Sequence, residues 1–274
     1  MSVAVNSQPI LENMLLGPAP DVIAVRVEPI AKRVRAFVGG VAIADSCRVM
    51  MMFETARLCV YYFPVSDVRT DLLVATSRVV RSAVKGEATY YSIAVDGRTV
   101  ESAAWRYLDP PAGCPEIGEL IAFHWKLMDA WFEEDEEVFV HARDPYHRID
   151  VRNSSREVRV VVNGQTLAVT TRAQFLFETG LPVRYYLPKK DVRMDLLQPS
   201  PVKTACAYKG PTSRYWQAPA ADGSLSDIAW CYENPAPEVG PIAGKVAFFD
   251  ERVDIYLDGN EMPRPRTKWS LEKP

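Results

Sequence analysis

The chain has 274 residues, 48% of them hydrophobic, so it is long enough to bury the core of one large domain or two smaller ones. Its 32 basic and 35 acidic residues give a formal net charge of -3, which disfavours a general nucleic-acid binder or an anionic-membrane binder. No apolar run approaches the roughly 20 residues of a membrane-spanning helix. From the charge we expect no nucleic-acid partner, and from the charge and the short apolar runs we expect no membrane partner.

The first segment and the cysteines indicate a cytoplasmic protein. Met1–Pro20 has no basic start and no small-residue cleavage site, so we expect neither a signal peptide nor an anchor there. The five cysteines are odd in number and form no Cys-x-x-Cys pair. This pattern disfavours a disulfide framework and a zinc site and favours a reducing cytoplasm.

The sequence contains an internal duplication. A shift of 124 residues aligns Phe53–Leu73 with Phe177–Leu197 and gives 12 identities in 21 positions. The same shift, or one of 125, aligns Lys85 with Lys209, Tyr91 with Tyr215, Trp105 with Trp230 and Tyr107 with Tyr232. We therefore expect two homologous domains, 22–125 and 151–260, joined by an acidic and aromatic linker, 126–150.

Both copies are predicted to consist mainly of strands. Val34–Val38 and Val158–Val162 are apolar runs that end at Gly39-Gly40 and Asn163-Gly164, which are hairpin signals. Asp96-Gly97 and Asp222-Gly223 repeat this signal. We expect helix only in short pieces, around Asp67–Ala75 and Asp191–Leu197, where an aspartate after a proline could cap a turn. The fold class is mainly β, built from antiparallel sheets with minor helix.

The end of the linker concentrates ionisable groups. His141 is followed by Arg143, Asp144 and Tyr146, a set suited to general-base chemistry if the linker crosses a cleft between the domains. The alternative is a surface histidine whose hydrogen bonds fold the linker.

At this point the motifs resemble a known family. The first copy carries Gly40, Glu54, Tyr62, Pro64, Asp67-Val68-Arg69, Lys85-Gly86, Trp105 and Tyr107, and the second carries Glu178, Tyr186, Pro188, Asp191-Val192-Arg193, Lys209-Gly210, Trp230 and Tyr232. This pattern resembles the bacterial family known as domain of unknown function 427, over about Val22 to Leu257. The segment around Asp129–Glu134 and His141–Asp150 looks like the linker of its tandem members.

The resemblance implies a fold similar to the β-tent, two antiparallel sheets meeting at an angle, as in the ligand domain of cereblon and in methionine sulfoxide reductase B. Many β-tents hold zinc with two Cys-x-x-Cys pairs, which this chain lacks, so we expect no metal. The family is grouped by name with nucleotidyltransferases, yet no Gly-Ser element with paired downstream aspartates is present to hold magnesium.

Charged residues shared by the copies supply catalytic candidates. Arg69 or Arg193 could anchor a substrate carboxylate or carbonyl, and Glu54 or Glu178 could act as general acid or base. The alternative is that the Asp-Val-Arg segments are ion-paired struts that tie each segment to its sheet. Lys85 and Lys209, before glycines, are interpreted as turn residues, and Cys206 as an inert buried thiol.

Aromatic residues supply binding candidates. Tyrosines and tryptophans gather in both copies and could line a pocket for a flat or apolar small molecule, or could fill the core. The substrate-binding candidates are Tyr186, Trp230, Tyr232, Arg143, Glu54, Arg69 and Trp105.

These observations lead to one functional hypothesis and its alternative. We expect a small-molecule enzyme that uses acid/base chemistry near the domain junction, with no cofactor, because no phosphate loop, dinucleotide fingerprint or Gly-x-Ser-x-Gly elbow occurs. His141, Glu178, Asp191 and Arg193 are the catalytic candidates. The alternative is a noncatalytic small-molecule-binding module, and which repeat carries the working site stays open.

Overall fold

The computed structural model describes residues 24–55, 57–219, 225–267, 269 and 270. The chain divides by its contacts into two compact units, and it passes from one to the other between Asp144 and Pro145. The expected absence of a signal in Met1–Pro20 and the expected turn at Asp222-Gly223 concern residues outside those described. Among the described residues, no helix has the length and apolar character needed to cross a membrane.

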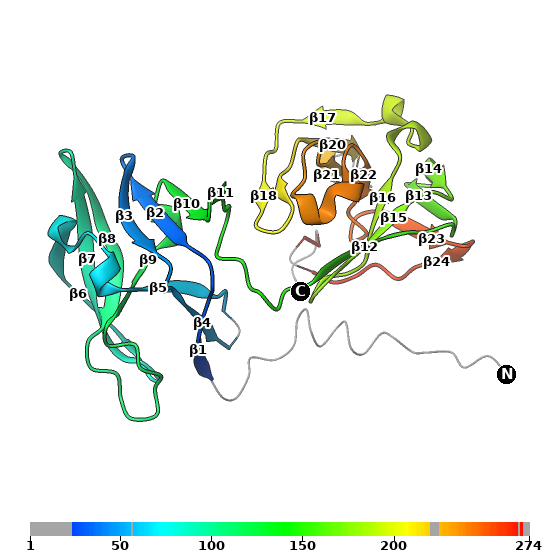
Figure 1. Ribbon diagram of the computed structural model, residues 1–274. Helices are drawn as coiled ribbons and strands as arrows, with labels where there is room; N and C mark the ends of the chain where they lie inside the picture. The colour runs from blue at the N-terminus through cyan, green and yellow to red at the C-terminus, as the bar shows by residue number, and fades with distance from the viewer. Residues whose placement is uncertain (1–23, 56, 220–224, 268, 271–274) are drawn as a thin grey trace. The chain divides into compact units, whose positions relative to one another are not determined.

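The first repeat consists of two antiparallel sheets (Figure 1). The large sheet has the strand order β1 (Val25–Pro29), β4 (Met50–Glu54), β5 (Val60–Pro64), β9 (Leu120–Phe123), β8 (Arg98–Tyr107), β7 (Gly86–Val95) and β6 (Leu73–Ser82). The small sheet has the order β11 (Glu136–Glu137), β10 (Ala130–Glu133), β2 (Val34–Val38) and β3 (Val41–Ser46).

The second repeat has the same topology, strand for strand. Its large sheet has the order β12 (Ile149–Asn153), β15 (Gln174–Glu178), β16 (Arg184–Leu187), β22 (Val246–Phe248), β21 (Leu225–Cys231), β20 (Arg214–Pro219) and β17 (Gln198–Ser200). Its small sheet has the order β14 (Gln165–Thr170), β13 (Val158–Val162), β23 (Asp254–Leu257) and β24 (Asn260–Glu261), and β18 (Ala205–Cys206) pairs with β19 (Gly210–Pro211). The prediction of two repeated, mainly β domains is therefore confirmed.

Short 3-10 turns replace the expected helices. In the first repeat they are η1 (Val65–Asp67), η2 (Thr70–Leu72) and η3 (Trp125–Leu127), and in the second η4 (Lys189–Asp191), η5 (Met194–Leu196) and η6 (Pro237–Ile242). Neither Asp67 nor Asp191 caps a turn, because each carboxylate accepts from a hydroxyl of the neighbouring strand instead. The prediction of aspartate-capped helices was wrong for this reason.

The hairpin prediction is confirmed at three of its sites. Gly39 and Gly40, Asn163 and Gly164, and Asp96 and Gly97 all have positive φ, between 46° and 78°, as turns joining antiparallel strands require.

The acidic stretch expected to be a linker is part of the first repeat up to residue 137. β10 pairs with β2, and β11 pairs with β10, so these residues complete the small sheet. The alternation at Ala130–Glu133, which buries Trp131 and Glu133, marks a strand with one buried face. The strand was not predicted because the surrounding acidic residues made the stretch resemble a solvated linker.

Each large sheet has two different faces. In the first repeat one face packs on the small sheet, with Tyr61, Phe63 and Ile121 meeting Val34, Val38 and Trp131 in one core. The opposite face carries a second buried cluster, which contains Tyr62, Tyr90, Tyr107 and the partly exposed Trp105. Neighbouring tyrosines 61 and 62 therefore point to opposite sides of the sheet, as the two-residue period of a strand requires. In the second repeat the corresponding clusters contain Tyr185 and Tyr186.

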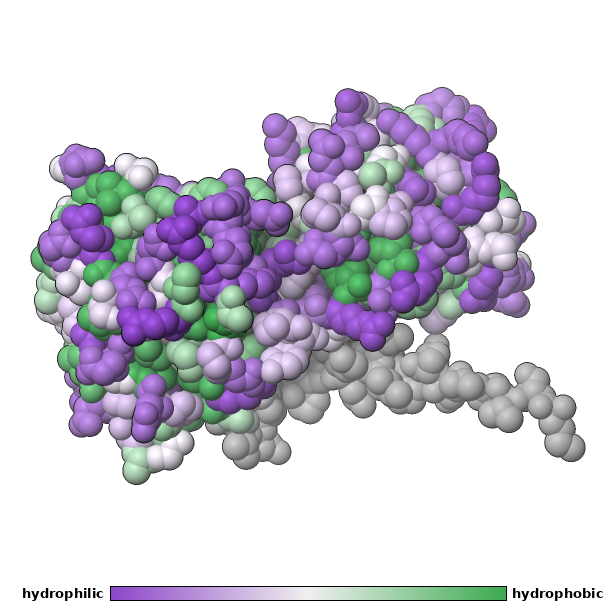
Figure 2. All heavy atoms as spheres, in the orientation of Figure 1, coloured by the Kyte–Doolittle hydropathy of each residue, from purple (hydrophilic) through white to green (hydrophobic). Residues whose placement is uncertain are grey.

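The strands at one edge of the large sheets differ between the repeats. β6 is ten residues long and exposes Val74, Val79 and Val80. Its counterpart β17 is three residues long and contains Pro199. Elsewhere hydrophilic residues cover much of the face seen in Figure 2, with apolar patches between them.

Candidate functional site

A glutamate and lysine pair lies on the aromatic face of both large sheets; both residues are buried in the second repeat, whereas in the first Lys85 is buried and Glu54 is partly buried. In the first repeat Lys85 donates to Glu54, and in the second Lys209 donates to Glu178 at 2.5 Å. The lysines stand just before Gly86 and Gly210, whose φ values are +83° and +86°. The lysines, expected only as turn residues, therefore turn inward and neutralise a carboxylate.

In the second repeat the glutamate has an additional partner. His147 Nε2 lies 3.0 Å from Glu178 Oε1, and the His147 ring stacks on Tyr208 with centroids 4.0 Å apart. Burial opposes ionisation of Glu178, but the His147 hydrogen bond and the Lys209 charge outweigh it and lower its pKa. Both carboxylate oxygens of Glu178 thus have a hydrogen-bond partner, and the lowered pKa makes Glu178 a weak general base.

An aromatic cluster adjoins each glutamate and lysine pair. Trp105 Nε1 donates to Tyr62 Oη at 3.0 Å, and Trp230 Nε1 donates to Tyr186 Oη at 3.3 Å. Both ring pairs are edge-to-face, with centroids 6.2 and 6.3 Å apart. Burial raises the pKa of both Tyr62 and Tyr186, so these hydroxyls stay protonated and serve as hydrogen-bonding groups.

The register of the strands corrects one expected equivalence. Tyr90 pairs with Trp105, and Tyr215 pairs with Trp230, so Tyr215 corresponds to Tyr90 and not to Tyr91. Tyr91 packs in the core between the sheets. A shift of one residue moves a side chain to the other face of a sheet, so the sequence alignment alone misassigned this ring.

One position in the cluster differs between the repeats. Ala122 of β9 pairs with Tyr62 and Trp105, as Ala247 of β22 pairs with Tyr186 and Trp230. Two residues on, on the same face, the first repeat has His124 where the second has Phe249.

The two rings occupy the same place in their clusters. His124 lies 4.6 Å from Trp105 and 5.9 Å from Tyr90, centroid to centroid. Phe249 lies 4.4 Å from Trp230 and 6.4 Å from Tyr215. His124 is therefore a substitution within a shared aromatic cluster.

The clusters also differ in exposure. Trp105 and His124 are partly exposed, whereas Trp230, Tyr215 and Phe249 are all buried. The first-repeat cluster, Tyr62, Tyr90, Trp105 and His124, is therefore the open one.

His124 has the features of a functional histidine. Neither ring nitrogen has a hydrogen-bond partner within the part of the chain that the structure describes, and the ring is held by aromatic stacking. Burial, assisted by the positive charge of Arg78, lowers its pKa, so the imidazole is neutral at pH 7. The Arg78 guanidinium lies 4.3 Å from the Tyr90 centroid, at the margin of the cluster. The sequence prediction missed His124, although its alignment with Phe249 at a shift of 125 was a usable signal.

The Asp-Val-Arg segments form surface ion pairs. Asp191 accepts from Thr170 and Arg172, as Asp67 does from Ser46 and Arg48, so each ties its 3-10 turn to a neighbouring strand. These contacts lower the pKa of both aspartates. Arg193 and Arg69 pair with Asp195 and Asp71, and all four side chains are more than half exposed. These contacts match the strut interpretation.

The predicted catalytic set is divided between the two units. His141 and Arg143 lie in the first unit, whereas Glu178, Asp191 and Arg193 lie in the second. His141 Nδ1 lies 2.7 Å from the carbonyl of Ala142, and the backbone N–H of Arg143 donates to Tyr61 Oη at 3.4 Å. Within the second unit, Glu178, Tyr186, Trp230 and Tyr232 are all buried, whereas Arg193 is exposed in a separate ion pair. No single unit therefore assembles the predicted set.

All five cysteines are free thiols in the structure. Burial raises the pKa of Cys231 to about 11, and Cys206 is partly buried on β18. In the described ranges, no group of three or more histidine, cysteine or carboxylate side chains is arranged to hold a metal ion.

Fold and site together define a tandem two-sheet β protein, with an aromatic cluster beside a glutamate and lysine pair in each copy. The model of a family described as a domain of unknown function (DUF427) matches residues 26–134 and again residues 150–259. The chain therefore belongs to the DUF427 family and carries its domain twice. A comparison with curated proteins found no match.

Proposed function

We propose that the protein binds a small planar molecule at the first-repeat cluster. The observation that carries this proposal is the partly exposed His124, whose ring nitrogens have no hydrogen-bond partner among the described residues while its ring lies against Trp105 and Tyr90. Ligand sites commonly combine aromatic walls with a few unpaired polar groups. The cluster therefore has the composition of a binding site, whereas the corresponding rings of the second repeat, Tyr215, Trp230 and Phe249, are buried.

The surrounding charges indicate the ligand's chemistry. Neutral His124 can accept a hydrogen bond from a ring N–H or a hydroxyl, and Arg78 can attract a negative or electron-rich edge. The aromatic rings supply flat apolar surface for stacking. A planar heterocycle or an aromatic acid satisfies all three groups. Glu54 is engaged with Lys85 and Arg57, so we assign it to the support of the cluster.

A ligand screen on the full chain tests this proposal. Planar heterocycles and aromatic acids are titrated by isothermal titration calorimetry in every variant, and the indole N–H resonance of Trp105 is followed by NMR in the variants that keep Trp105. Trp105→Phe and His124→Phe, the second of which installs the second-repeat residue, should weaken binding at least tenfold. Trp125→Phe is the matched control, because Trp125 stacks on Trp131 on the other face of the sheet, with centroids 4.6 Å apart. Equal affinity of every hit for wild type and His124→Phe would contradict the proposal.

Acid/base catalysis at His124 is the second candidate function. A neutral imidazole at pH 7 can take a proton from a bound ligand, and general-base catalysis contributes about 10² to 10⁴-fold. His124→Gln keeps hydrogen-bonding groups but cannot take up the proton. If His124 is a base, this variant should bind hits normally and lose turnover by that factor. Turnover unchanged in His124→Gln would leave the noncatalytic binding module.

A further inference from the structure

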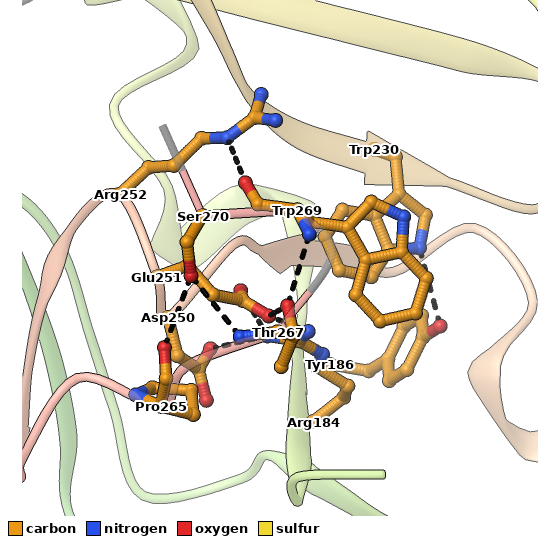
Figure 3. A network of polar contacts seen from close by, with 10 residues as sticks. All are labelled: Arg184, Tyr186, Trp230, Asp250, Glu251, Arg252, Pro265, Thr267, Trp269 and Ser270. Carbon is orange, nitrogen blue, oxygen red and sulfur yellow. Dashed lines mark hydrogen bonds and ion pairs between the residues drawn. The ribbon is translucent and has the colours of Figure 1, made fainter. Parts of the chain in front are cut away.

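A short segment beyond the second DUF427 match covers part of the second repeat. The match ends at residue 259, and residues 263–267, 269 and 270 follow β24; we call them the strap. Thr267 is buried, and Trp269 packs against the cluster that contains Tyr186, Trp230 and Phe249. Figure 3 shows Trp269 with Trp230 and Tyr186. The strap is therefore an addition to the family domain that contacts its aromatic face.

Thr267 forms the central polar contact of the strap. Its hydroxyl donates to Glu251 Oε1 at 2.5 Å, and the same hydroxyl oxygen accepts from the backbone N–H of Trp269 at 3.1 Å. Arg252 Nε donates to the carbonyl of Trp269 at 3.0 Å. These contacts hold the backbone of Trp269 at both its N–H and its carbonyl.

Arg184 links this polar contact to the aromatic rings. Its guanidinium donates to both oxygens of Glu251, at 2.8 and 2.6 Å, and its central carbon lies 5.7 Å from the ring centroids of both Trp230 and Trp269. The guanidinium therefore contacts one tryptophan from the sheet and one from the strap, a geometry that favours cation–π attraction to both.

The first repeat lacks the residues that hold the strap. By strand register, Val60 corresponds to Arg184, and Trp125 and Lys126 correspond to Asp250 and Glu251. Trp105, the counterpart of Trp230, is partly exposed. The strap and the residues that hold it thus occur together in the repeat whose cluster is closed.

We infer that Trp269 occupies, in the second repeat, a ligand site for a planar aromatic ring, and that displacement of the strap opens this site. The inference rests on the proposed function, because it takes the aromatic cluster to be the ligand site of the domain. It also specifies the ligand class, because the ring that fills the site is an indole. The second site differs from the first in having a buried guanidinium, that of Arg184, and in having Phe249 where the first has the imidazole of His124.

Indole is the probe that tests this inference on the full chain. The indole N–H resonances of Trp105, Trp230 and Trp269 are followed in wild type and in Thr267→Val, which removes the hydroxyl that binds Glu251. Loss of a hydrogen bond to a charged group should increase the population of the displaced strap about tenfold. Thr171→Val is the matched control, since Thr171 is exposed on the same repeat.

The expected result is a joint response of two tryptophans. Indole should shift the N–H resonance of Trp230 and move the N–H resonance of Trp269 to the chemical shift of a solvent-exposed tryptophan. Both changes should occur at about tenfold lower indole concentration in Thr267→Val than in wild type or Thr171→Val. If Trp269 stays packed against the cluster at every indole concentration in Thr267→Val, the inference is wrong. It is equally wrong if Trp269 moves while Trp230 does not respond.

Two further readouts separate the possible failures. The resonance of Trp105 reports binding at the first repeat, and the resonance of Trp230 reports binding at the second. A Trp105 resonance that does not respond to any ligand would therefore contradict the proposed function, whereas the inference about the strap is tested at Trp230 and Trp269. If Thr267→Val does not fold, Trp269→Gly keeps the polar contact and removes only the ring. Indole should then raise the melting temperature of Trp269→Gly and leave that of Trp269→Phe unchanged, and an equal effect on both would contradict the inference.

Discussion

Asp250 provides the sharpest test of the buried polar network in Figure 3. Burial, and the adjacent Glu251, raise the pKa of Asp250 to about 7, although Arg184 NH1 at 3.5 Å partly opposes the shift. The difference from the ordinary value of 3.8 corresponds to about 4 kcal/mol, at about 1.4 kcal/mol per pH unit. One acidic group thus makes the stability of the second repeat strongly dependent on pH.

The sign follows from proton binding. The folded state holds the Asp250 proton more tightly than the unfolded state does, so this stabilisation is fully present below the ordinary pKa and is lost as the pH rises through about 7. Between pH 5 and pH 8 the group should lower the free energy of unfolding by about 3 kcal/mol. Asp250→Asn removes this dependence, so its stability relative to wild type should rise by that amount over the same interval.

Urea unfolding of the full chain measures this difference. The indole resonances of Trp216 and Trp230 report the second repeat only. Glu251 does not produce such a difference between pH 5 and pH 8, because the Arg184 and Thr267 contacts outweigh burial and lower its pKa from 4.5, so its contribution disappears only at lower pH. A stability difference between Asp250→Asn and wild type that is the same at pH 5 and pH 8 would show that Asp250 titrates as an ordinary ionised partner of Arg184.

Three further predictions concern the glutamate and lysine pair, the surface arginines and His124. Glu178→Gln should lower the free energy of unfolding of the second repeat by about 3 to 5 kcal/mol in urea titrations, because it leaves Lys209 as an unpaired buried charge, and the double variant with Lys209→Met should recover most of the loss. Arg193→Lys should leave both the melting temperature and ligand affinity unchanged, because the pair with Asp195 is exposed to solvent, and a clear loss of affinity would restore the anchor role. An NMR titration of the His124 ring should give a pKa below the ordinary histidine value, and binding at the first-repeat cluster should weaken only when the pH falls through it.

Features that repeat in the sequence were predictable. The 12 identities between Phe53–Leu73 and Phe177–Leu197 indicated two copies, and those segments indeed form the same strands and turns. The glutamate and lysine pairs could also have been found, since acid and base are separated by 31 residues in both copies. These pairs were not predicted because a lysine before a glycine is typical of a solvated turn.

Features that depend on register or on a single copy were not predictable. Strand faces decide that Tyr62 joins the cluster while Tyr61 does not, and a one-residue difference in register separates Tyr90 from Tyr91. The segment that follows β11 in the first copy, residues 138–144, contains neither threonine nor tryptophan, so the comparison of repeats gave no signal for Thr267 or Trp269. Asp191 and Arg193 are catalytic candidates because they recur, but recurrence also marks residues such as Asp191, which accepts a hydrogen bond from the neighbouring strand and so ties its turn to the sheet.

The unequal edge strands have a consequence for how the protein behaves at high concentration. Every second residue of an edge strand directs its N–H and C=O groups away from the sheet, where another chain can pair with them. β17 is protected, since it is short and Pro199 has no N–H to donate. β6 offers ten residues without proline and three exposed valines, so strand addition between chains, the first step of β-aggregation, should begin there. A lysine at position 79 would place a charge on that edge and improve solubility without touching either cluster.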